Sequence, residues 1–183
     1  MTADRRWYTE PETFIALAAL VVSISAVVVG LYEASLQRRH DRNEVWPHAE
    51  LQIFTKQTGA TLMIENTGIG PAIVQSISVT VDGQPRKTWK DVFATLNGVD
   101  PIPFSHYSAV QHGLRPGDRL ALFDIPVEDQ PHDFWKAMAR VGVRMCYASV
   151  FDEYWIVDVR ALGEKTTWQT VARCPVQADS VEF

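Results

Sequence analysis

The sequence has few of the residue types that bind metals or carry redox chemistry. It contains two cysteines, Cys146 and Cys174, and neither lies in a C-x-x-C pair, which argues against zinc-binding and thioredoxin-like motifs. His106 and His112 share a face of a candidate strand, but no acidic residue or third ligand stands nearby at a suitable spacing. We therefore expect no metal site and no cofactor.

Catalytic motifs are missing as well. The chain has no G-x-S-x-G sequence, which argues against a nucleophile of the α/β-hydrolase type. An enzyme would have to use acids such as Asp124, Glu128 or Asp152, for which the sequence shows no partner. The formal net charge of −5 provides no attraction for a phosphate backbone. We expect a protein that is not an enzyme, with no catalytic residues and no nucleic-acid partner.

Long apolar runs are also scarce, because residues 14–31 form the one such run in the chain. They read FIALAALVVSISAVVVGL without a charge. A helix of this length spans about 27 Å, close to the thickness of the hydrocarbon core of a bilayer. With one such run, the monomer is not expected to act as a channel or transporter.

Residues 14–31 could form a membrane span, a secretory signal peptide or a buried core helix. Arg5 and Arg6 supply the basic start of a signal peptide, but the apolar run is too long and residues 32–35 lack a small-x-small cleavage pattern. A core helix would carry polar residues along one side, and only two serines interrupt this run. We predict an uncleaved single span in the lipid bilayer, with a cleaved signal as the main alternative.

The arginines that flank the apolar run bear on its orientation. Arg38, Arg39 and Arg42 follow it, whereas two arginines and the amino terminus precede it. The positive-inside rule counts lysines and arginines near the membrane ends, and here the margin is narrow. It predicts that the soluble domain is cytoplasmic. The two cysteines could form a bridge in the periplasm and would be reduced in the cytoplasm.

The pattern of the chain changes after the apolar run. Residues 32–45 have a helix-forming composition, and Pro47 disfavours helical geometry at Trp46 before it. Further on, apolar and polar residues alternate with period two, which is typical of half-buried strands. The expected strands are residues 50–54, 60–65, 72–81, 106–111, 119–125, 141–150, 154–160 and 166–173.

Turns and two short helical insertions separate these strands. Asp82-Gly83 predicts a tight hairpin. Thr88 can cap a helix that ends at Asn97-Gly98, and residues 129–140 predict a second helix. Because strands and helices do not alternate regularly, we expect a mainly β protein with an antiparallel β-sandwich. The expected organisation is a tail over 1–13, a transmembrane helix over 14–32, a juxtamembrane helix or linker over 33–46, the β-sandwich over 47–175 and a tail over 176–183.

The sharpest local motif is Asn66 to Ala72, which reads NTGIGPA. A phosphate-binding glycine loop would require a helix to follow, and a strand pattern follows instead. The motif therefore predicts a structural turn, in which Asn66 bonds to nearby amides, Gly68 and Gly70 permit positive φ, and Pro71 fixes the entry into the next strand. A ligand-binding loop is the alternative.

Several motifs together resemble known families. The N-x-G-x-G-P-A corner, a strand that ends in V-D-G and a later L-x-P-G-x turn resemble the immunoglobulin-like adhesion modules of the CARDB type. The order R-R-H-D-R, W-P-H and N-T-G-I-G-P-A is similar to a group of bacterial single-pass membrane proteins of uncharacterised function, chiefly over residues 14–85. The resemblance implies an immunoglobulin-like β-sandwich behind a membrane anchor, and it carries over no catalytic residue.

Asp152, Glu153, Tyr154 and Trp155 form an acidic and aromatic hairpin tip, which is a candidate surface for a partner or ligand. Ordinary packing of a solvated turn is the alternative. We expect a membrane-anchored, non-enzymatic binding or scaffold module with a protein partner. The alternative is a ligand-sensing membrane effector whose β-domain controls self-association of the transmembrane helix. Small residues that permit close helix contact occur throughout the span, namely Ala16, Ala18, Ala19, Ser23, Ala26 and Gly30.

Overall fold

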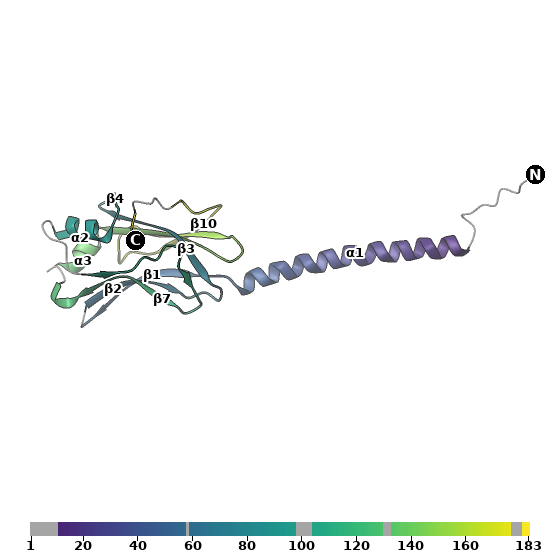
Figure 1. Cartoon of the computed structure of the whole chain (residues 1–183), viewed down its shortest axis with the longest axis horizontal. Coiled ribbons are helices and arrows are strands. Elements are labelled where there is room, and N and C mark those ends of the chain that lie inside the picture. Colours follow the sequence, from purple (N-terminus) through teal and green to yellow (C-terminus); the bar gives the residue numbers. More distant parts are fainter. Residues whose placement is uncertain (1–10, 58, 98–103, 130–132, 177–180) are drawn as a thin grey trace, which may run out of the picture. The chain divides into compact units, whose positions relative to one another are not determined.

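The chain consists of one long helix and a mainly β unit. The computed structural model describes residues 11–57, 59–97, 104–129, 133–176 and 181–183. The contacts divide the chain into two compact units, Met1–Asn43 and Glu44–Phe183, and the second is called the β-unit below. Figure 1 shows the helix and the strands of the β-unit.

Helix α1 (Pro11–Glu44) contains the predicted span. Proline is well suited to the first position of a helix, where its missing N–H has no partner to lose. Within the first unit, no described residue covers the apolar side chains, and Leu31 is 69% exposed. The hydroxyls of Ser23 and Ser25 donate to the carbonyls of Ala19 and Val21, both at 2.8 Å, so both hydroxyls are satisfied within the helix. By length and composition, α1 could cross a membrane or serve as a signal sequence.

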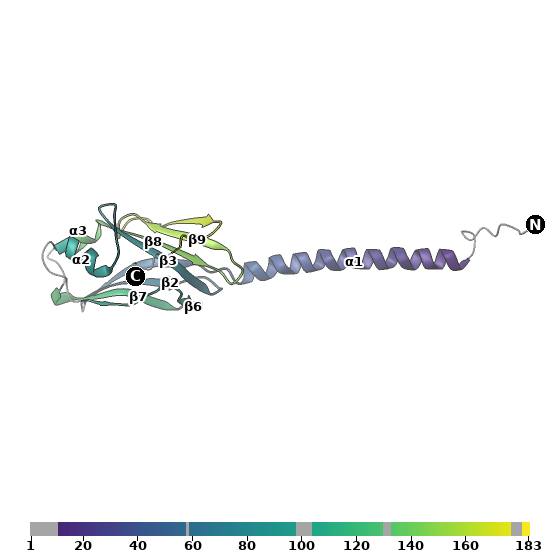
Figure 2. The same cartoon turned by 45° about the horizontal axis from the view of Figure 1, so that its top comes forward.

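The strands form two antiparallel sheets. The first sheet has the order β1-β2-β7-β5, from strands β1 (Ala49–Lys56), β2 (Gly59–Asn66), β7 (Arg119–Pro126) and β5 (Ser105–His106). The second has the order β10-β9-β8-β3-β4, from strands β10 (Thr167–Val171), β9 (Tyr154–Val159), β8 (Val141–Ala148), β3 (Ala72–Val81) and β4 (Gln84–Arg86). Strand β6 (Gly113–Leu114) pairs with the start of β3. Figures 1 and 2 show the two sheets as two layers.

Alternating side chains from both sheets form one hydrophobic core. Leu62 of β2 and Phe123 of β7 enter it from the first sheet, and Met145 of β8 enters it from the second. A bulge between Val74 and Ser76 shifts the alternation of β3. Beyond this bulge, the serines of β3 lie on the outer face of the second sheet.

Helix α2 (Trp89–Asn97) packs beside the core, and the Thr88 cap is confirmed because its Oγ1 accepts a hydrogen bond from the amide of Asp91 at 3.1 Å. The indole of Trp89 contacts the rings of Phe123 and Phe183, with centroid distances of 4.9 and 5.2 Å. The predicted tail over 176–183 thus includes Phe183, which is 1% exposed in the core.

Two predicted elements are wrong in extent. The strand expected over 106–111 is β5 alone, and the chain then turns at Gln111, whose φ is 64°. Within the helix expected over 129–140 the structure has the short helix α3 (Phe134–Met138), and the 3-10 turn η2 (Val127–Asp129) ends where the expected helix begins. Phe134 and Met138 are the buried residues of α3, so its apolar stripe lasts barely one turn. Residues 98–103, which include the expected glycine stop of α2, lie outside the described residues.

Candidate functional site

The corner after β2 is held by the side chain of Asn66, which is fully buried. Its Nδ2 donates to the carbonyls of Gly70 at 2.8 Å and Leu114 at 3.0 Å. Its Oδ1 accepts from the amides of His48 at 3.2 Å and Gly68 at 3.1 Å. Both amide hydrogens and both oxygen lone pairs are therefore used within the chain. This arrangement favours the structural interpretation of the corner over a ligand-binding loop.

The two glycines of the corner are required by close backbone contacts. A Cβ at Gly68 would lie 2.2 Å from the amide nitrogen of His48, and one at Gly70 would lie 1.8 Å from the carbonyl oxygen of Val45. Neither glycine has a positive φ, unlike Gly83 or Gly117, so the conformational reason expected from the sequence does not apply. Pro71 directly precedes β3, as predicted.

Of the four residues of the predicted hairpin tip, Asp152 is exposed, whereas Glu153, Tyr154 and Trp155 are half-buried. Asp152 occupies the turn between β8 and β9 with a φ of 57°, and its Oδ1 accepts a 3.5 Å hydrogen bond from the hydroxyl of Tyr154. The amides of Phe151 and Glu153 donate to the hydroxyl of Ser149 at 3.1 and 3.3 Å, which orders the turn.

Trp155 belongs to the packing of the sheet rather than to an exposed tip. Its ring stacks on Tyr147 at a centroid distance of 5.5 Å, and it packs against the core. The exposed apolar side chains at this turn are instead Val150 and Phe151, at 52% and 41%. Val150 and Phe151 directly precede the predicted tip residues, 152–155.

Cys146 and Cys174 form a disulfide with a Cα–Cα distance of 5.6 Å, which is in the usual range. Cys146 lies on the outer face of β8, between Ser76 of β3 and Ile156 of β9. Cys174 follows β10 in the chain. The bond therefore fastens the chain after β10 to the outer face of the second sheet.

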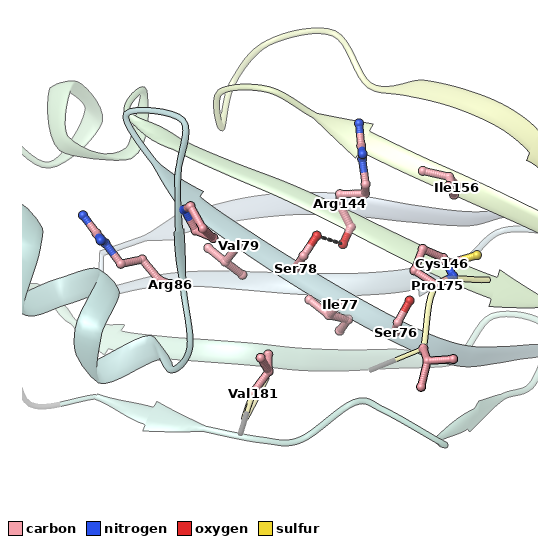
Figure 3. A pocket seen from close by; sticks show the side chains of 12 residues that line it. Ser76, Ile77, Ser78, Val79, Arg86, Arg144, Cys146, Ile156, Pro175 and Val181 are labelled. Atoms are coloured by element: carbon pink, nitrogen blue, oxygen red, sulfur yellow. Dashed lines mark hydrogen bonds between the residues drawn. The ribbon is translucent and has the colours of Figure 1, made fainter. Parts of the chain in front are cut away.

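An apolar groove lies beside this bond and is the best candidate for a functional site. Its volume is about 230 Å³. Figure 3 shows its floor on the outer face of the second sheet and Pro175 beside Cys146. Its floor and its wall come from parts of the chain far apart in sequence. The floor includes Ser76, Ser78, Arg144, Cys146 and Ile156, and the wall includes Pro175, Val176 and Val181.

The chemistry of the groove suits binding. The guanidinium of Arg144 donates to Oδ2 of Asp158 at 2.6 Å, so its charge is already paired. The buried Nε of Arg86, at one end of the groove, has no hydrogen-bond partner among the described residues. None of the residues found to line the groove is a histidine, a carboxylate or a free thiol. The groove can bury a small apolar group, and the described residues that line it include no acid–base pair.

The wall of the groove is part of the closing segment, defined as the described residues 174–176 and 181–183. One end of this segment is fixed by the disulfide. At the other end, the amide of Glu182 donates to the carbonyl of Lys87 at 2.8 Å, and the carbonyl of Phe183 accepts from the amide of Ala109 at 3.3 Å. The sequence left the cysteine pairing open, and it gave no sign of the contacts of Glu182 and Phe183, because no periodic pattern accompanies these residues.

The clear pKa shifts of the described residues lie outside the groove. Hydrogen bonding to the guanidinium of Arg140 lowers the pKa of Asp82. Burial raises the pKa of Tyr147 to about 12, against the opposing effect of a backbone hydrogen bond with Ala49. The part of the chain that the structure describes holds no group of three or more side chains placed to bind a metal ion.

No protein-family model matches the chain, and a search of curated proteins found no match.

Proposed function

We propose that this chain is a membrane-anchored, non-enzymatic binding module of the bacterial inner membrane, built on an immunoglobulin-like β-sandwich. The groove is the observation that carries the proposal, because it combines an apolar lining with an absence of acid–base groups among its lining residues. At about 230 Å³ it is smaller than the usual site for a drug-sized molecule. It suits an apolar side chain of a protein partner.

Anchoring through an uncleaved α1 is supported by the bare apolar surface of that helix within its unit. The lipid bilayer would bury that surface, which is the arrangement that the hydrophobic effect favours. The expected cytoplasmic placement of the β-unit depends on a small difference in arginine count, and the disulfide argues against it.

Site-directed crosslinking in native membranes tests the binding proposal. A photoreactive amino acid at Ile156, in the groove, should capture a protein, whereas the same group at Thr55, exposed on the first sheet, should not. Ile156→Glu should likewise reduce co-purification of the captured protein at least tenfold, and Thr55→Glu should leave it unchanged. Equal capture at both positions, or none at either, would refute a groove-based function.

A ligand-sensing effector is the second candidate, because the apolar lining of the groove could also hold a small free ligand. In this case an apolar ligand in the β-unit would control association of α1 with a second copy. A side chain at Gly30 would meet nothing within 4 Å, so the helix itself tolerates Gly30→Leu. Loss of ligand-dependent self-association in this variant, measured by sedimentation in detergent, would support the ligand-sensing hypothesis. Unchanged self-association would exclude the face of α1 that carries Gly30 as the contact between two copies.

A further inference from the structure

The chain has two cysteines in all, and they are bonded to each other. Bacterial cytoplasm keeps thiols reduced, and stable disulfides form in the periplasm and outside the cell. The pairing is therefore an indicator of compartment that is independent of the arginine count.

The position of the bond indicates a structural role. Cys146 is 2% exposed, and the bond closes a separation of 28 residues between β8 and the chain after β10. Catalytic and regulatory disulfides need a sulfur that a second thiol can reach. Cys146 is buried in the face of the sheet and Cys174 is half-buried, an arrangement typical of a structural cross-link.

The same bond completes the groove. Cys146 contributes to its floor, and Pro175 and Val176, which follow Cys174, contribute to its wall. Reduction would loosen this end of the closing segment, because the 3.9 Å approach of the Cys174 sulfur to the carbonyl of Tyr147 is too long to hold it in place of the bond. The complete groove therefore requires an oxidising environment.

We infer that the β-unit lies on the extracytoplasmic side of the membrane, with the amino terminus inside, and that its groove binds only in the disulfide-bonded form. The arginine count does not oppose this orientation strongly, since two arginines and the amino terminus balance the three arginines beyond the span. The position of the amino terminus rests on the proposed function, because it requires that α1 is an uncleaved anchor. The extracytoplasmic location of the β-unit rests on the disulfide alone.

Thiol trapping in intact cells tests the bond. Cells that make the full chain are quenched with acid, denatured and treated with a maleimide of 5 kDa polyethylene glycol. The wild type should gain no tag before reduction and two tags after it. Cys146→Ala and Cys174→Ala should each gain one tag without reduction, which assigns the tags. Two tags on the unreduced wild type would overturn the inference.

Labelling of spheroplasts with a membrane-impermeant maleimide tests the orientation. A thiol introduced by Lys165→Cys, at an exposed position of the β-unit, should react. A thiol introduced by Ala3→Cys should react only after permeabilisation. The reverse pattern would overturn the inference. If the Lys165→Cys thiol reacts but the chain has lost the region around Ala3, the proposed uncleaved anchor is refuted and the extracytoplasmic location of the β-unit is supported. Neither labelling result depends on the capture of a protein partner.

Discussion

Single buried polar side chains order the ends of the β-unit where the sheets leave backbone groups unpaired. Asn66 connects the chain before β1, the corner after β2 and the end of β6 through four hydrogen bonds. Ser149 has the same role on a smaller scale in the turn between β8 and β9. Such residues fix loop geometry, and loss of one leaves several buried partners unsatisfied.

Asn66→Ala should lower the free energy of unfolding by about 3 kcal/mol, because each buried group left without a partner costs roughly 1–3 kcal/mol. Denaturant titration of the full chain in detergent would measure it. Thr67→Ala is the matched control, since Thr67 is exposed and its hydroxyl contacts are long, at 3.2 and 3.5 Å. A loss below about 1 kcal/mol in Asn66→Ala would contradict the assigned role.

Tyr147 should make the stability of the β-unit sensitive to alkali. Its pKa rises from 10.0 to about 12 on folding, so the neutral phenol is favoured in the folded state. The contribution is complete below pH 10 and decreases as the pH rises towards 12, by about 2 to 3 kcal/mol in total. The difference in unfolding free energy between the wild type and Tyr147→Phe, followed from pH 9 to pH 12, should show this slope. Parallel curves of unfolding free energy against pH for the two proteins would exclude this contribution of Tyr147.

At the scale of elements, α1 is longer than a bilayer requires. Its 34 residues extend about 51 Å, whereas the hydrocarbon core is about 30 Å thick. The apolar residues occupy 14–31, and charged residues occur from Glu33 onward. The two parts of one helix therefore suit different surroundings.

Val22→Arg should impair membrane retention, because arginine at the centre of a span costs about 2.5–3.5 kcal/mol. Leu36→Arg, on the same helix but outside the apolar run, should be retained like the wild type. The measured quantity is the share of full-length chain that stays in membranes after an alkaline carbonate wash. Equal retention of both variants would show that α1 is not a span.

Local chemistry allowed several elements to be predicted closely. The bounds of the strand expected over 72–81 match β3 in full, and Asp82 and Gly83 have the paired positive φ values, 52° and 75°, of the expected hairpin turn. Strands β4 and β6 were missed because two or three residues are too few to show a period. Gln111 was assigned to a strand because its neighbours alternate, although its backbone turns.

The candidate site could not be predicted, because it depends on contacts between distant residues. Ser76, Cys146 and Ile156 become neighbours only through the register of three strands. The bulge in β3 decides that Ser76 faces outward, and no local pattern marks it. The pairing of Cys146 with Cys174 could not be decided from sequence either, since two cysteines alone do not reveal their compartment.

At the scale of the whole molecule, the β-unit is closed by the last residues of the chain. Phe183 enters the aromatic cluster around Trp89, and the disulfide holds the chain after β10 against the second sheet. The two fastenings lie on either side of the groove wall. Stability of the core and integrity of the groove are therefore coupled.

Phe183→Ala should destabilise the β-unit by about 3–5 kcal/mol, the usual cost of removing a buried phenylalanine ring. Val176→Ala should have little effect, because Val176 is 93% exposed. Thermal unfolding of the full chain in detergent would compare them. Equal midpoints for both variants would mean that Phe183 does not contribute to the core.

Because a reducible bond borders the groove, the fraction of the protein in which a reductant opens that bond at equilibrium reports what occupies the groove. A compound that binds only the closed form, supplied at about 100 times its Kd, would shift the thiol–disulfide balance roughly hundredfold towards the oxidised protein. Small apolar molecules can thus be screened by following the release of thiols under dithiothreitol. Such a screen works even while the natural ligand is unidentified.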